Sequence, residues 1–240
     1  MTFHPLPTIQ PMLNLYEKPR TDERFQAYLK LLKGDTKGDL VLPIGGYNPM
    51  AKDGLILKLK ELQTLKAEQI MAEVLSEINL QYSNHKNPQT FKVALNLSDD
   101  LQGGWTNRFT SDYDSKFKIN ALVNRQFCTP FFWSSEEFSE EKIRQRIAEY
   151  VFRTIYWLEN PKPKTLKEHI EQEQFITQKT GNTKFEGSFT DLVKLYQEHQ
   201  YSENYHLIFN FFYGNKASES LAFPIFGIED NVAGFDFMNQ

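Results

Sequence analysis

The residues best suited to chemistry gather in one polar segment, 98–117, with the sequence SDDLQGGWTNRFTSDYDSKF. The segment follows an alternating, strand-like stretch, and loops at strand ends commonly carry binding groups. Its Gly103–Gly104 pair lets backbone amides approach a ligand closely. Trp105 offers a stacking face, and Arg108 offers a bidentate fork for a carboxylate or phosphate. We therefore expect a small polar ligand, such as a sugar, a nucleotide-like molecule or a peptide, to bind here.

The aspartates of this segment extend the hypothesis from binding to catalysis. We expect Asp99 among the ligand contacts, and Asp112 or Asp114 as the base of a hydrolase-like reaction in which Arg108 holds an anion. The alternative is an ordered structural loop, with Trp105 packed into the core and Arg108 paired with Asp112. The aspartate spacing does not match a calcium-binding EF-hand loop, and no metal site is predicted here.

Two weaker candidates lie elsewhere in the chain. His169 and Glu173 are four residues apart on a predicted helix and share one face, as a metal ligand set or an acid–base pair would. The HxxxE pattern is not the HExxH of zinc peptidases, and we expect His169 not to bind metal. The Gly45–Gly46 pair could hold an anion before a helix, but without a Walker lysine or a GxGxxG pattern it is interpreted as a tight turn.

Composition limits the class of partner. The 240 residues carry a formal net charge of -4, from 27 basic and 31 acidic side chains, which gives no long-range attraction for nucleic acid. No window approaches the ~18 apolar residues of a membrane-spanning helix, and the N-terminal residues lack the pattern of a signal peptide. The single cysteine, Cys128, excludes an intramolecular disulfide and predicts a buried thiol in a reducing, cytoplasmic protein.

Proline marks the domain organisation. Residues 1–20 contain four prolines and are interpreted as an extended arm, because proline fixes φ and removes a backbone donor. Residues 21–240 are expected to form a single compact α+β domain. The only candidate seam lies near 160–164, at Pro161 and Pro163.

Hydrophobic periodicity predicts more helices than strands. The clearest helix spans about 139–159, with Arg144, Arg146 and Arg153 away from the centre of its apolar stripe. Further helices are expected at about 65–82, 165–180 and 188–200. Thr165 and Glu168 form a capping-box pattern that opens the helix over 165–180, and Ser134 and Glu137 have the same spacing before the helix over 139–159. Strands are expected at 39–44, 91–97, 127–133 with an interruption at Pro130, and 221–228. Residues 205–213 fit a strand or a buried helix.

These observations predict several helices packed on a small mixed or antiparallel sheet. The leading functional hypothesis is an intracellular protein that binds a small polar ligand around 98–117. The alternative is a non-enzymatic interaction or structural protein with an aromatic C-terminal surface, which could also support a homo-oligomer. The sequence identifies no cofactor and leaves open whether the protein is an enzyme.

Overall fold

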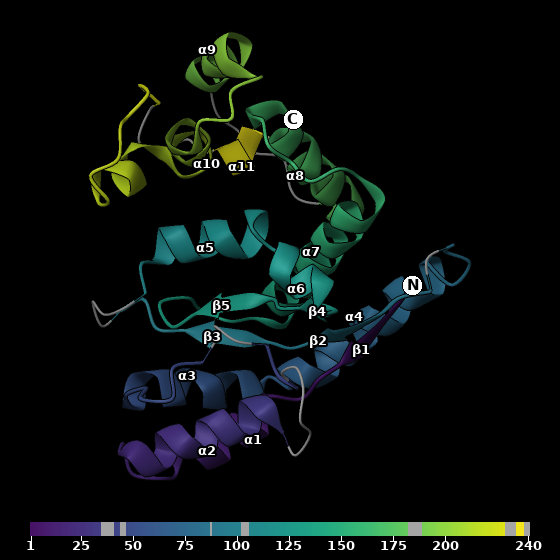
Figure 1. Ribbon diagram of the computed structural model, residues 1–240, viewed down its shortest axis with the longest axis vertical. Coiled ribbons are helices and arrows are strands. Elements are labelled where there is room, and N and C mark those ends of the chain that lie inside the picture. Colours follow the sequence, from purple (N-terminus) through teal and green to yellow (C-terminus); the bar gives the residue numbers. More distant parts are fainter. Residues whose placement is uncertain are drawn as a thin grey trace. The chain divides into compact units, whose positions relative to one another are not determined.

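The computed structural model describes residues 1–34, 41–43, 47–86, 88–101, 106–181, 189–228 and 234–237 (Figure 1). The chain forms two compact units, Met1–Val151 and Phe152–Gln240, and the boundary between them falls within helix α7 (Glu140–Glu159). The predicted seam near 160–164 follows the end of that helix, and the single domain over 21–240 stays a prediction. In the described part of the chain, no helix is long and apolar enough to cross a membrane.

The first unit is built on parallel strands. Strands β1 (Thr2–Pro5), β2 (Thr90–Val93) and β4 (Phe127–Cys128) pair in the order β1-β2-β4, and β3 (Asn96–Ser98) pairs with β5 (Phe131–Trp133). Every one of these pairings is parallel. The prediction of a mixed or antiparallel sheet is therefore wrong, whereas the combination of helices with a small sheet is confirmed.

Backbone hydrogen bonds connect the β2–β4 ladder to the β3–β5 ladder. The Ala94 amide donates to the Cys128 carbonyl at 3.0 Å, and the Asn96 amide donates to the Pro130 carbonyl at 2.9 Å. Pro130 has no amide hydrogen to donate, so it occupies the break between β4 and β5 that the sequence predicted.

Helical crossovers make the parallel pairing possible, because parallel strands cannot be joined by a tight hairpin. In Figure 1, two groups of helices lie on opposite sides of the strands. The first group is α1 (Ile9–Tyr16), α2 (Asp22–Lys33), α3 (Asp53–Thr64) and α4 (Ala67–Gln81), and the second is α5 (Arg108–Phe117) and α6 (Asn120–Asn124). With both faces covered, Ala94 and Leu95 are each 0% exposed.

The N-terminal residues are not an extended arm. They form β1 and α1, and Pro11 lies near the start of α1, where a missing amide hydrogen costs little. The Asn79 side chain brackets the backbone of Phe3, accepting from its amide and donating to its carbonyl, both at 2.8 Å. In the order β1-β2-β4, β1 is an edge strand, and Asn79 satisfies backbone groups of Phe3 that no neighbouring strand binds in the described part of the chain.

Two further predictions in the N-terminal part of the chain concern a strand at 39–44 and a turn at Gly45–Gly46. Within the predicted strand 39–44, Val41–Pro43 are bend and coil, and the other residues lie outside the described part of the chain. The Gly45–Gly46 turn also lies outside the described residues.

The second unit is helical in its described residues, with α8 (Leu166–Thr180), α9 (Thr190–His199), α10 (Tyr205–Glu219) and the short α11 (Gly234–Phe237). Thr165 and Glu168 form the predicted capping box of α8, and Gly181 ends that helix with φ 68°. Residues 205–213 are helix, which resolves the open alternative, and 221–228 are not a strand. In α10, Phe209, Phe211 and Phe212 are each 0% exposed and belong to the core.

Candidate functional site

In the polar segment 98–117, Arg108–Phe117 form the helix α5. Ser98 ends β3, and Asn107 caps α5 by accepting from the Thr110 amide at 3.1 Å. Residues 102–105 lie outside the described part of the chain. They include the Gly103–Gly104 pair predicted to approach a ligand and the predicted stacking face of Trp105.

Four charged side chains near the carboxyl ends of β3 and β5 form a cluster that we call the clasp: Asp100, Arg108, Glu136 and Arg146. Arg108 binds the Asp100 carboxylate at 3.0 Å and the Glu136 carboxylate at 3.1 Å. Arg146 binds the other Glu136 oxygen at 3.1 Å and donates to the Phe131 carbonyl at 2.7 Å. The clasp thereby joins the β3 end, the start of α5, the β5 end and α7.

Serines after β5 complete the clasp. The Ser135 amide and hydroxyl donate to Asp100 at 2.9 and 2.6 Å, and the Ser134 hydroxyl donates to Asp99 at 2.8 Å. Burial raises the pKa of Asp100, but the Ser135 donors, the Arg108 charge and the Ser134 hydroxyl together outweigh it, so the pKa lies below its usual value. Asp100 is a stably ionised structural carboxylate.

The charged residues of the segment form neither the predicted ligand site around Arg108 nor the alternative pair of Arg108 with Asp112. Arg108 binds Asp100 and Glu136 rather than Asp112. Asp112 pairs with Lys116 at 2.7 Å, and Asp114 pairs with Lys118 at 2.7 Å. The guanidinium of Arg108 also lies 5.7 Å from the centroid of the Trp133 ring. Because its donors are engaged within the clasp, Arg108 is poorly suited to hold a ligand anion.

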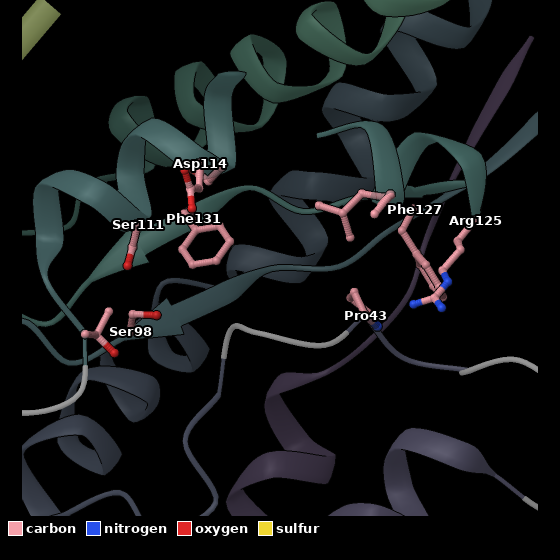
Figure 2. Close-up of a pocket in the computed structure, with 11 residues that line it drawn as sticks. Pro43, Ser98, Ser111, Asp114, Arg125, Phe127 and Phe131 are labelled. Atoms are coloured by element: carbon pink, nitrogen blue, oxygen red, sulfur yellow. The ribbon is translucent and has the colours of Figure 1, made fainter. Parts of the chain in front are cut away.

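A pocket of about 360 Å³ lies beside the clasp, between α5, α6 and the strands, and we call it the α5–α6 pocket (Figure 2). Three buried apolar side chains, Pro43, Phe127 and Phe131, contribute to its lining. Ser98 reaches the pocket from the carboxyl end of β3, whereas Phe127 and Phe131 begin β4 and β5. The pocket therefore covers part of the sheet face as well as the carboxyl edge where parallel sheets usually bind ligands.

Hydroxyl groups supply much of the polar lining. Ser115 donates to the Asp112 carbonyl at 2.8 Å and shares a hydrogen bond with the Tyr150 hydroxyl at 2.7 Å. Thr106 and Ser111 also line the pocket, and neither hydroxyl has a hydrogen-bond partner within the described part of the chain. Figure 2 shows Ser98, Ser111 and Asp114 grouped around the Phe131 ring. The pocket thus combines an apolar floor with hydroxyls that are available to a bound molecule.

Two charged residues of opposite sign complete the lining, Asp114 from α5 and Arg125 after α6. Both residues are exposed, so they lie at the solvent side of the pocket. In Figure 2, Arg125 lies beside Phe127, and Asp114 lies apart from it near Phe131.

In the second unit, Glu173 forms a buried ion pair with Arg153. Glu173 accepts from Arg153 at 2.9 and 2.5 Å, and both side chains are almost fully buried. Burial lowers the pKa of His169 to about 4, despite the opposing charges of Glu173 and Glu168, so the imidazole is neutral at neutral pH. Within the described residues, no group of three His, Cys, Asp or Glu side chains could hold a metal ion.

Sequence reasoning missed Ser135, Glu136 and Arg146 of the clasp, and Ser111 and Arg125 of the pocket. These residues could not be found because the sequence does not show that the two strands run parallel. Once β3 and β5 are known to be parallel, the polar residues that follow each strand must meet at one edge. The pocket residues lie on helices and strand starts, where no local sequence pattern marks them.

No family model, curated protein or solved structure matches this chain.

Proposed function

We propose that this protein binds a small polar molecule in the α5–α6 pocket. One observation carries the proposal: the hydroxyls of Thr106 and Ser111 line the pocket beside a buried apolar floor, and no described residue binds either of them. Ligand pockets commonly have volumes of about 300–1,000 Å³, apolar walls and a few polar groups that fix orientation, and this pocket has about 360 Å³. Five described positions of segment 98–117 line this pocket: Ser98, Thr106, Ser111, Asp114 and Ser115.

The proposal assigns binding rather than hydrolysis to this site. Asp112 is paired with Lys116 and is not among the described residues that line the pocket. Asp114 lines the pocket but is exposed and paired with Lys118, and a general base must reach the proton that it removes. We therefore assign Asp114 to ligand contact, and Asp99 and Arg108 to maintaining the wall beside the pocket. A reducing, cytoplasmic location agrees with the single buried cysteine, Cys128.

A fragment screen followed by protein NMR tests the proposal. Ser111→Trp should block the pocket, because the Ser111 side chain points into it (Figure 2). Asn124→Trp is the matched control, since Asn124 is an exposed α6 residue outside the lining set. If Ser111→Trp fails to fold, Ala121→Trp blocks the same pocket from α6.

We expect polar fragments to shift amide signals of α5, α6 and β5 in the wild type and in Asn124→Trp, and not in the blocked variant. Fragments that bind the blocked and unblocked proteins equally, or a polar library that yields no ligand for the wild type, would contradict the proposal.

A further inference from the structure

A second hollow, of about 540 Å³, lies between α1 and α2, and we call it the α1–α2 groove. Each helix contributes residues at i, i+3, i+4 and i+7, which share one helical face. The described lining consists of Pro11, Asn14, Leu15 and Lys18 from the α1 face, and Ala27, Lys30, Leu31 and Gly34 from the α2 face. In Figure 1 both helices lie on the side of the strands opposite α5 and α6, so the groove is separate from the α5–α6 pocket.

Apolar side chains form the base of the groove. Leu15 is 3% exposed, and Pro11, Ala27 and Leu31 are half-buried beside it. The lining residues extend over about 10 Å of each helix, at the helical rise of about 1.5 Å per residue. An extended octyl chain has a similar length. The volume of about 540 Å³ lies in the range of small-molecule sites, whereas a stable protein partner would need roughly 800 Å² of surface on each side.

The charges that line the groove have one sign. Lys18 and Lys30 contribute to the lining, and its described residues include no carboxylate. The Lys30 ammonium has no ion pair or hydrogen bond in the described part of the chain. Lys18 pairs with Glu23 at 2.9 Å, but the two side chains are 43% and 65% exposed, and such surface pairs contribute little net stability. The groove thus combines an apolar base with positive charge, in a chain whose formal net charge is -4.

We propose that the α1–α2 groove binds a free aliphatic carboxylate, in the chemical class of the fatty acids. The acyl chain packs on Leu15, Ala27 and Leu31, and the carboxylate binds the Lys30 ammonium at the rim. Lys18 adds to the positive potential, which favours an anionic head group over a neutral or cationic one. A carboxylate without an apolar chain would leave the base of the groove in water and would gain nothing from its burial.

Four probes separate the contributions of the chain and the charge. Octanoate has both, octanol and octylamine keep the chain with a neutral or a cationic head group, and acetate keeps the carboxylate without the chain. NMR titrations at low salt measure each affinity from the amide signals of the wild-type protein. We expect octanoate to shift signals of α1 and α2 and to bind about fivefold or more tightly than octanol or octylamine, because charge-assisted hydrogen bonds are the stronger class. Acetate should not shift these signals to saturation.

Two matched pairs of variants locate the carboxylate. Lys30→Gln should weaken octanoate binding about fivefold and leave octanol binding unchanged, whereas Lys33→Gln, at an exposed position outside the described lining, should change neither. Ala27→Asp places a carboxylate at the half-buried base and should weaken octanoate binding more than octanol binding. Gln26→Asp adds the same charge at an exposed neighbour and is the control. If Ala27→Asp fails to fold, the comparison of Lys30→Gln with Lys33→Gln decides the result.

Octanol or octylamine binding as tightly as octanoate, or equal octanoate affinities in Lys30→Gln and Lys33→Gln, would overturn the proposal. Octanoate shifts confined to signals outside α1 and α2 would overturn it too. The test is independent of the proposed function, because Ser111→Trp blocks the α5–α6 pocket and should leave octanoate affinity unchanged. Octanoate binding that is lost in Ser111→Trp would contradict a site in the α1–α2 groove.

Discussion

The clasp and the α5–α6 pocket draw on the same segment of the chain but use its polar groups in opposite ways. In the clasp, Arg108 binds both Asp100 and Glu136, and Asp100 also accepts a hydrogen bond from Ser135. In the pocket, the hydroxyls of Thr106 and Ser111 have no partner in the described part of the chain. A dense cluster of charged residues is thus internally satisfied, while a sparse set of small hydroxyls is available.

This difference shows why residue type alone is a weak guide to function. Arginine and aspartate attract attention in a sequence, but buried charges must be paired, and the pairing consumes their binding capacity. Serine and threonine can leave a hydroxyl unpaired at modest cost when the site is open to water. Substitutions in the clasp should consequently change stability, and substitutions in the pocket should change ligand affinity.

The largest effect is expected at Glu136, whose side chain is 10% exposed and binds both Arg108 and Arg146. Glu136→Ala leaves the half-buried Arg146 without its carboxylate, and loss of one member of a buried pair costs about 3 kcal/mol. Urea unfolding at neutral pH measures the change. Glu137→Ala, at an exposed neighbouring position, is the control and should shift the unfolding free energy by about 0.5 kcal/mol or less. Equal effects of the two substitutions would mean that the clasp does not stabilise the fold.

A smaller, pH-dependent effect is expected at Asp100. Its folded-state pKa lies below the unfolded value, so its stabilisation is present above pH ~4 and is lost as the pH falls through the folded pKa. Asp100→Asn should lower stability by about 1–2 kcal/mol at neutral pH. The difference between wild type and variant should shrink in acid, as urea midpoints across a pH series would reveal. A difference that stays constant down to the lowest pH would show that the Asp100 charge is not the cause.

The smallest effect on stability is expected at Ser111. Ser111→Ala removes a hydroxyl that no described group binds, and the unfolding free energy should change by about 0.5 kcal/mol or less. Affinity for a pocket ligand should fall by about fivefold, as expected for loss of one neutral hydrogen bond of about 1 kcal/mol. A large loss of stability in Ser111→Ala with unchanged ligand affinity would contradict the assignment of Ser111 to ligand binding.

Local patterns predicted the helices well. The apolar stripe of the helix over 139–159 corresponds to α7, with Ile143 and Ile147 each 0% exposed. The capping box at Thr165 and Glu168 and the break at Pro130 were also predicted, because these features depend on residues close together in the chain. The predicted capping box at Ser134 was not found: its hydroxyl binds Asp99 and Asp100, and Ser139 instead accepts from the Lys142 amide at 3.1 Å.

Features that depend on distant residues could not be predicted. Strand direction follows from where the crossover helices pack, and it decides which strand ends meet. Arg153, placed off the apolar stripe of its helix, is 3% exposed because Glu173 on another helix accepts hydrogen bonds from its Nε and Nη2 atoms. In the same way, the partners of Arg108 come from 8 and 28 residues away, and no spacing rule connects them.

The most direct test of the central claim is a crystal structure of the protein with the tightest polar fragment from the screen. The account predicts a ligand in the α5–α6 pocket, hydrogen-bonded to Thr106 or Ser111 and packed on Phe131, with the Arg108 contacts to Asp100 and Glu136 unchanged. A ligand that displaces Asp100 or Glu136 from Arg108 and leaves the pocket empty would contradict it, because the clasp would then be the binding site and the pocket a packing feature.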